Sequence, residues 1–300
     1  WKEVVPMIDF GCDIYLHDIG PSYDVNDVSS ILKGIIACNQ KTKEILGRKM
    51  KVLVRPNGNN KYITAGRQYD DVAFMTSENN TDIGAPLNVT FNNDVELKKA
   101  TQYRRYTEPT PAVSQLMPYI DEKALAGTYA WVHDFSHAPA DFQYILDLFT
   151  NINDKYGKDG SDCVWFASMD EVYEYNYIRK HCTVEKNISN NVLTLKFSVH
   201  SSDLPNEMQF HRDFSILVSG ISMKKGTIVD TGDNIYGLSY SQKGENLLVN
   251  VNCNKSLIDK ANRYTGIYEK EKTVSKKEDA LYFINQLKDK LKTTYLNRIK

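Results

Sequence analysis

The first 182 residues contain short runs of consecutive apolar residues, separated by segments with helical periodicity. Strands that are covered on both faces have such continuous apolar runs, so the pattern predicts a parallel sheet. Strands that alternate with helices indicate an α/β fold with crossover connections. The predicted strands are 13–17 (DIYLH), 51–55 (KVLVR), 72–76 (VAFMT), 88–91 (NVTF), 129–134 (YAWVHD) and 164–168 (VWFAS).

Three segments between or after these strands predict helices. Residues 26–46 start with a capping Asn and end at Gly47, a residue type that suits the left-handed end of a helix. Residues 141–156 carry apolar side chains at helical spacing, and residues 170–181 follow the last predicted strand.

The pattern changes near residue 182, where short alternating segments begin. These predict a small antiparallel β-sandwich with strands at 192–199, 214–219, 227–230, 236–241 and 246–252. Residues 276–299 form one amphipathic pattern, with Leu281, Ile284, Leu287 and Leu291 on one face, and predict a C-terminal helix. We therefore expect three parts, at 1–182, 183–255 and 256–300.

Composition and charge restrict the class of protein. The chain has 300 residues, of which 41% are hydrophobic and 25% charged, as in folded globular proteins. Its 37 Lys and Arg balance 38 Asp and Glu, which argues against nucleic acid as the main partner. No apolar run is long enough to predict a membrane span. The five cysteines are widely spaced, without a CxxC pair, which argues against a zinc cluster and predicts buried free thiols.

Three side chains that could take part in catalysis lie at or near the ends of separate predicted strands: His17, Arg55 and His133. In parallel α/β folds, functional side chains gather at the carboxyl ends of the strands, so we expect these three to converge. Asn57 and Asp134 lie beside them in the sequence and are candidates for contacting a substrate. A single such histidine would more simply be a solvated loop residue or a core residue; three at equivalent places favour a site.

Four segments, in this order, give the first 182 residues a resemblance to a known family. They are 1–17 (WKEVVPMIDFGCDIYLH), 38–56 (CNQKTKEILGRKMKVLVRP), 129–134 (YAWVHD) and 164–175 (VWFASMDEVYEY). Together they resemble the motifs of the NodB-homology polysaccharide deacetylases. The resemblance implies a distorted (β/α) barrel, incomplete at its N-terminus, and the hydrolysis of acetyl groups on a glycan.

The same resemblance implies roles for individual residues. His17 would be a metal ligand, Arg55 would orient the catalytic base, and His133 would be the general acid. The metal would be a divalent ion, usually zinc, which imidazole binds well. A bound metal of this kind activates water and stabilises the oxyanion. The family context also implies an exported protein, although the sequence contains no export signal.

Two departures from the family pattern leave an alternative open. The family's second motif has two histidines four residues apart, but the fourth residue after His17 is Pro21, which cannot bind a metal. Asp18 and Asp24 are possible replacements. Arg55 directly precedes Pro56, where the family spaces these residue types by two. The alternative is a catalytically degenerate protein that binds carbohydrate or a protein partner without turnover.

The family's first motif, a strand with two Asp residues, has no counterpart in these 300 residues. Six predicted strands are also too few for a closed barrel of this type, which needs seven or eight. We therefore expect roughly 50–100 further residues before Trp1 in the complete protein, by analogy with barrel size. Those residues would carry the base and one metal ligand.

Overall fold

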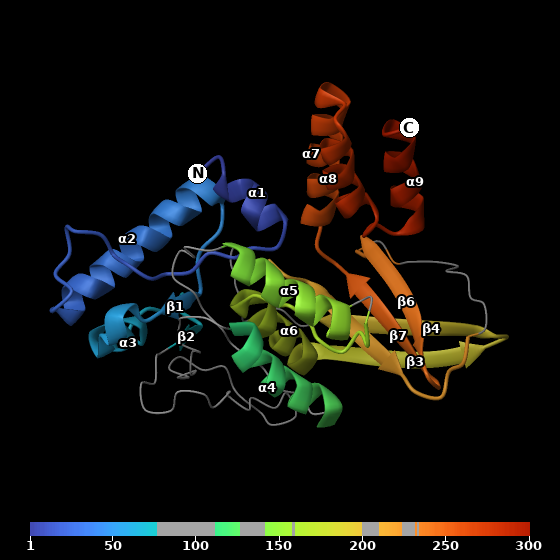
Figure 1. Cartoon of the computed structure of the whole chain (residues 1–300), viewed down its shortest axis with the longest axis horizontal. Coiled ribbons are helices and arrows are strands. Elements are labelled where there is room, and N and C mark those ends of the chain that lie inside the picture. Colours follow the sequence, from blue (N-terminus) through green and yellow to red (C-terminus); the bar gives the residue numbers. More distant parts are fainter. Residues whose placement is uncertain (77–111, 127–141, 158–159, 200–209, 224–231, 233) are drawn as a thin grey trace. The chain divides into compact units, whose positions relative to one another are not determined.

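The structure is a computed structural model that describes residues 1–76, 112–126, 142–157, 160–199, 210–223, 232 and 234–300 (Figure 1). The strands predicted at 88–91, 129–134 and 227–230 lie outside these residues. The chain divides into two compact units, Trp1–Asp170 and Glu171–Lys300. The boundaries predicted at residues 182 and 255 remain predictions.

The first unit contains a short parallel sheet. Strand β1 (Val52–Val54) pairs in parallel with β2 (Phe74–Thr76), and Leu16 forms a parallel bridge to Leu53 in β1. The predicted strands at 51–55 and 72–76 are thus confirmed in shorter form, whereas the segment at 13–17 contributes only one bridging residue. A mixed α/β arrangement follows from these pairings, and the complete barrel remains a prediction.

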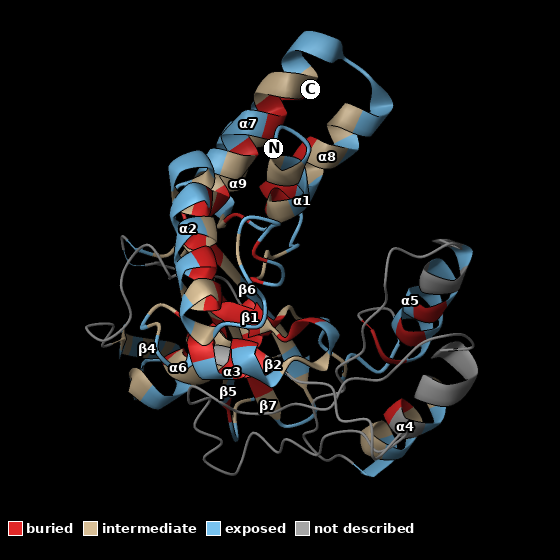
Figure 2. Ribbon diagram, turned by 90° about the vertical axis from the view of Figure 1, so that its left-hand side faces the viewer, coloured by how far each residue is buried: buried red, intermediate tan, exposed pale blue. Residues whose placement is uncertain are grey.

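Helix α2 (Val28–Leu46) connects the bridging residue Leu16 to β1 and confirms the predicted helix at 26–46. Its N-terminal cap is Asp27, one residue after the predicted Asn, and the Asp27 side chain accepts a hydrogen bond from the Ser30 N–H. Gly47 ends the helix in the left-handed conformation with φ of 69°. Figure 2 shows buried residues along one side of α2, among them Ile31 and Ile35.

The remaining helices of the first unit are α1 (Val4–Asp9), the short 3-10 helix η1 (Pro56–Gly58), α3 (Asn60–Gly66), α4 (Ala112–Ala126) and α5 (Phe142–Tyr156). Helix α5 confirms the prediction at 141–156. Helix α4 was not predicted, because Pro118 lies inside it and proline usually interrupts a helix. The two helices share a core of Ile120, Leu148, Ile152 and Tyr156.

The prediction of a strand at 164–168 is wrong. Residues 163–168 adopt no regular structure, and the side chains of Trp165 and Phe166 are each 47% exposed. Val164 is partly buried and packs against the core that α4 and α5 share. The apolar run thus does not mark a strand covered on both faces.

The second unit contains two antiparallel sheets. Strands β3 (Cys182–Ser189) and β4 (Val192–Val199) pair through a two-residue turn in which Asn190 and Asn191 are both left-handed. Strands β5 (Asp213–Val218), β7 (Asn246–Asn252) and β6 (Gly237–Lys243) form the other sheet in that order. The antiparallel strands predicted at 192–199, 214–219, 236–241 and 246–252 are thereby confirmed.

Helix α6 (Met169–His181) leads into the second unit and confirms the prediction at 170–181. Its residue Ile178 shares a buried cluster with Phe214 of β5 and Val251 of β7. The ring of Phe197 in β4 meets the ring of Phe214 edge-on, with centroids 5.1 Å apart. The two small sheets and α6 therefore share one core.

The C-terminus consists of three helices, α7 (Ser256–Glu271), α8 (Val274–Ile284) and α9 (Asp289–Arg298). The prediction of one helix at 276–299 is therefore wrong. The helix stops at Ile284 because the chain turns there: Leu287 enters the core, and the Lys288 N–H bonds to the Tyr236 carbonyl. Their core contains Leu257, Ala261 and Tyr264 of α7 and Ala280, Phe283 and Ile284 of α8, and α9 packs the partly buried Leu291, Tyr295 and Leu296 against it.

Two further expectations concern the surface. The five cysteines are free thiols, but none is buried, since Cys12 and Cys163 are exposed and the other three are half-buried. Among the described residues, no helix is both long and apolar enough to cross a membrane.

Candidate functional site

The carboxyl ends of two adjacent parallel segments bring His17 and Arg55 to one edge of the sheet. Leu16 and Val54 bond to each other through the Val54 N–H, at 2.8 Å, so the residues that follow them lie side by side. The exposed ring of His17 bonds through Nδ1 to the Val54 carbonyl at 3.0 Å. Because a carbonyl can only accept, Nδ1 carries the proton and Nε2 of the neutral ring keeps its lone pair.

Arg55 is buried, and its guanidinium contacts the loop that follows β1. The Nη1 group donates to Oδ1 of Asn60 at 2.5 Å. A side-chain carbon added at Gly58 would lie 3.9 Å from Nη2 of Arg55. Arg55 therefore supports the loop of residues 56–60 from below. Its expected role in orienting a carboxylate base remains a prediction.

Asn57 lies at the tip of this loop in the left-handed conformation, with φ of 48° and ψ of 30°. Asparagine tolerates this conformation better than most residues do. The sequence pattern marked both Asn57 and Asn59 as unusual residues of this loop, but it gave Asn59 no role and did not indicate Lys61. Asn59 caps α3 by accepting the Lys61 N–H at 3.0 Å, a role that an Asn directly before a helical segment signals.

Asn59 and Lys61 also connect this loop to the turn before α2. Nδ2 of Asn59 donates to the Val25 carbonyl at 2.8 Å, and Nζ of Lys61 donates to the Asn26 carbonyl at 2.7 Å. The two loops at the carboxyl edge are therefore held together by side chains. No pattern in the sequence indicates these two long-range bonds.

The structure distinguishes the two carboxylates that could replace the missing histidine. Asp24 is engaged in its own turn, since Oδ1 accepts the Asn26 N–H at 2.8 Å. Asp18 is exposed and lies near the buried hydroxyl of Tyr62, whose pKa is raised by burial and then by the charges of Asp18 and Cys38. Asp18 is thus the more available carboxylate beside His17.

A divalent metal fits the described residues only in part. In the neutral ring of His17 the bond of Nδ1 to a carbonyl places the lone pair on Nε2, the arrangement in which imidazole binds a metal. However, the described part of the chain contains no group of three His, Cys, Asp or Glu residues that could hold a metal. His133 and Asp134 lie outside the described residues. We therefore derive no step of the reaction through a metal.

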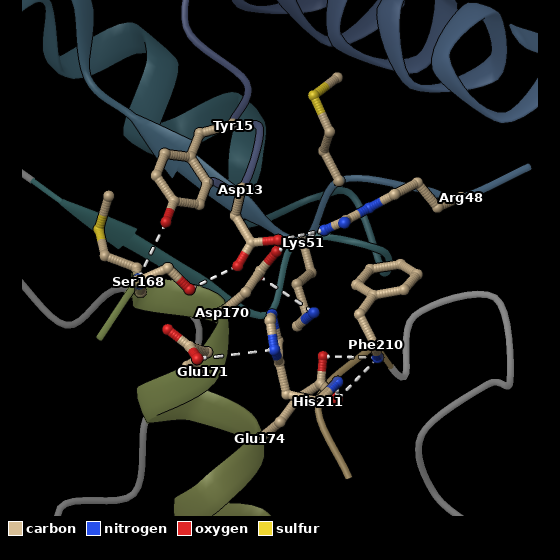
Figure 3. A network of polar contacts seen from close by, with 12 residues as sticks. Asp13, Tyr15, Arg48, Lys51, Ser168, Asp170, Glu171, Glu174, Phe210 and His211 are labelled. Atoms are coloured by element: carbon tan, nitrogen blue, oxygen red, sulfur yellow. Dashed lines mark hydrogen bonds and ion pairs between the residues drawn. The ribbon is translucent and has the colours of Figure 1, made fainter. Parts of the chain in front are cut away.

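A second polar cluster of the first unit lies at the opposite edge of the sheet (Figure 3). Arg48 Nη2 bonds to Asp13 at 2.7 Å and to Asp170 at 3.0 Å, and Lys51 Nζ lies 3.1 Å from Asp170. Asp13 also accepts a hydrogen bond from the Ser168 hydroxyl. Asp13 precedes Leu16 and Lys51 precedes β1, so this cluster is at the amino ends of the strands.

The charged side chains of this second cluster are buried. The side chains of Lys51 and Asp170 are fully buried, and burial raises the pKa of the Asp170 carboxyl against the opposing charge of Lys51. Burial, followed by the charges of Asp170 and Asp13, also raises the pKa of the neighbouring Tyr15. The two positive and two negative groups of this buried cluster compensate one another, so removing one of them would leave an uncompensated charge in the interior.

In the second unit, Figure 3 also shows the carboxylate of Glu174 on α6. It accepts hydrogen bonds from the N–H groups of Phe210 and His211, at 2.8 Å each for Oε2. Glu174 is buried, and its contacts fix the chain where it enters β5. Sequence reasoning did not find this residue, because a Glu in the middle of a helix carries no distinctive pattern.

The described fold and the carboxyl-edge pair of His17 and Arg55 define a class: a mixed helix-and-sheet protein with its candidate site at the ends of parallel strands. A family model described as "Putative polysaccharide deacetylase" matches residues 1–299. The chain therefore belongs to this polysaccharide deacetylase family, as its resemblance to deacetylases indicated. No curated protein matches the chain significantly.

Proposed function

We propose that this protein is a hydrolase that removes acetyl groups from a polysaccharide or oligosaccharide. The observation that carries the proposal is the family match, which extends over residues 1–299 and thus includes the candidate site. The position of His17 and Arg55 at one edge of the sheet supports it, because this is where α/β enzymes place reacting groups. The glycan substrate and a site of action outside the cell are parts of the same proposal.

Within this proposal, the described residues have separate tasks. His17 presents Nε2 at the edge, held in position by its bond to the Val54 carbonyl. Asn57 offers its side-chain amide at the loop tip that Arg55 supports, which suits contact with sugar hydroxyls. His133 is proposed as the proton donor to the leaving group and Asp134 as a substrate contact, both by resemblance.

A divalent metal, zinc first, remains a proposal with His17 as one ligand. When bound, such a metal polarises an acetyl carbonyl and acidifies water. Metal content measured on the purified protein tests this part separately. A protein that releases acetate with no bound divalent ion, and at an undiminished rate after chelation, would exclude the metal but not the hydrolysis.

The reaction itself is tested by measuring acetate released from acetylated oligosaccharides by the intact protein and by the His133→Ala variant. The proposal expects release by the wild type, and a variant in which kcat falls far more than KM rises, because a proton donor acts in the transition state. An unchanged kcat in the variant would exclude His133 as the donor.

A second candidate function is a degenerate deacetylase that binds carbohydrate without turnover. Pro21 in place of the second histidine favours it, together with the absence of a three-ligand group from the described residues. Calorimetry that shows binding of an acetylated oligosaccharide would support this candidate, provided that no acetate is released with any of the divalent metals added. Measurable turnover would exclude it.

A further inference from the structure

The C-terminal helices carry a strong excess of positive charge. Residues 254–300 contain twelve Lys and Arg against six Asp and Glu, a net charge of +6, whereas the whole chain has a net charge of -1. The rest of the chain therefore has a net charge of about -7. The positive segment forms α7, α8 and α9 around their own core, so the charge belongs to one folded part.

Two of these charges are held together at the turn between α7 and α8. The Nζ of Lys272 lies 4.9 Å from the centroid of the Tyr268 ring, and the Nζ of Lys277 lies 5.9 Å from it. Each contact between an ammonium and an aromatic face is favourable, but two like charges at one ring repel each other. An acidic group bound between them would remove this repulsion.

Glu269 offsets this pair in part, because its pKa is lowered first by its hydrogen bonds to Arg298 and further by the charge of Lys272. No carboxylate of the described residues forms an ion pair with Lys272 or Lys277. Both oxygens of Glu269, which is adjacent to Tyr268, are held by Arg298 at 2.9 Å. Asp279 pairs instead with Lys276 at 3.1 Å. The positive charge at this turn is thus only partly compensated, and neither ammonium group forms a direct ion pair within the described residues.

Lys272 occupies a backbone position that normally selects glycine. It ends α7 with φ of 53°, in the left-handed region that disfavours residues with a side chain. Lysine is strained in this backbone conformation, but its side chain places an ammonium group over the ring of Tyr268. This observation also supplies a useful variant, because glycine fits the same position without strain.

We propose that Tyr268, Lys272 and Lys277 bind the acidic groups of an anionic polysaccharide, such as its uronate carboxylates or sulfates. The inference rests on the proposed function, because it names the chemical class of the polymer that the deacetylase holds. The ring of Tyr268 offers apolar surface to a sugar, and the two ammonium groups pair with its acidic substituent. The negative charge of the rest of the chain disfavours a long nucleic acid.

The test is calorimetric titration of the intact protein with polygalacturonate, at low and at physiological salt. We expect binding that weakens with salt. In the double variant Lys272→Gly/Lys277→Gln, we expect affinity at low salt to fall roughly tenfold and the salt dependence to become shallower, because two charge contacts are lost. The melting temperature should not fall, since glycine relieves the strain at position 272.

Matched controls separate the site from general charge. The variant Lys186→Gln/Lys196→Gln removes two exposed charges from β3 and β4 and should bind like the wild type. The inference is overturned if the Lys272/Lys277 variant binds equally well, if neutral dextran binds as tightly, or if a DNA oligonucleotide or phosphatidylglycerol vesicles bind more tightly. Polymer binding without acetate release would contradict only the proposed function, and acetate release without polymer binding only this inference.

Discussion

At the scale of single residues, the candidate site depends on the direction of one hydrogen bond. The Val54 carbonyl fixes the proton of His17 on Nδ1, which leaves Nε2 to meet whatever binds at the sheet edge. The same ring without this bond would rotate freely and present either nitrogen. The carbonyl of β1 therefore prepares the histidine for its proposed role.

Replacing His17 with alanine tests that role. We expect kcat/KM for acetate release to fall roughly 100-fold, a loss typical of removing a group that orients or binds the reacting centre. Folding should be unaffected because the side chain is exposed. His181→Ala is the matched control, since Nδ1 of His181 also bonds to a carbonyl, that of Tyr177 at 2.9 Å, but on α6. Equal losses in both variants would argue against a special role for His17.

The buried charges at the other edge predict a large effect on stability. Asp170→Asn leaves Lys51 and Arg48 without one of their anions, and breaking such a buried pair costs about 3–5 kcal/mol. Chemical denaturation measures this loss. Glu44→Gln removes a comparable but exposed pair with Lys41 and should cost less than about 1 kcal/mol. Similar losses in the two variants would mean that the buried cluster contributes no more than a surface pair.

At the scale of elements, a local signal in the sequence ends helix α2 at Gly47. Gly47 caps the end of α2 and Gly266 lies inside α7, and a side-chain carbon added to either meets nothing within 4 Å. They differ in backbone conformation, because only Gly47 is left-handed, with φ of 69°. Because neither site offers a steric clash, the change in stability on substituting alanine depends on the backbone conformation of each glycine.

We predict opposite signs for alanine at these two glycines. Gly47→Ala should destabilise the protein by about 1 kcal/mol, because alanine is strained in the left-handed region. Gly266→Ala, inside α7, should stabilise it by about 0.5–1 kcal/mol, because alanine favours the helix. Thermal unfolding of the two variants tests both values, and a stabilising Gly47→Ala would contradict the role of Gly47 in ending α2.

Elements with strong local signals could be predicted from the sequence, and those that depend on distant contacts could not. The cap and glycine of α2 and the alternation of β4 lie within the segments themselves. By contrast, the break before α9 depends on Leu287 entering a core that α7 completes. Val164 and its neighbours resemble a buried strand, but helices α4 and α5 cover only part of the run.

The candidate site divides in the same way. Its position at the strand ends followed from the order of strands, so His17 and Arg55 were found. The supporting bonds from Asn59 and Lys61 join loops more than thirty residues apart, and no local pattern encodes them. The buried cluster around Asp170 was missed for the same reason, since its members come from segments far apart in the chain.

At the scale of the whole molecule, the family match over residues 1–299 suggests one kind of chemistry, deacetylation, for the chain. The second unit and its positive C-terminal helices fit this chemistry if they hold a charged polymer. The proposed divalent metal is tested by chelation: if His17 holds such a metal, a strong chelator should abolish acetate release and added zinc should restore it, because a bound metal would supply activated water. Full activity after exhaustive chelation would exclude a metal from the reaction.

Hydrolysis of acetyl groups on a glycan is the hypothesis on which the predictions of activity rest. Proton NMR of an acetylated oligosaccharide incubated with the intact protein and a divalent metal tests this hypothesis without any variant. We predict that the signal of the bound acetyl methyl group declines while the signal of free acetate grows by the same amount. Binding of the oligosaccharide with no free acetate, across the divalent metals and over prolonged incubation, would contradict the hypothesis.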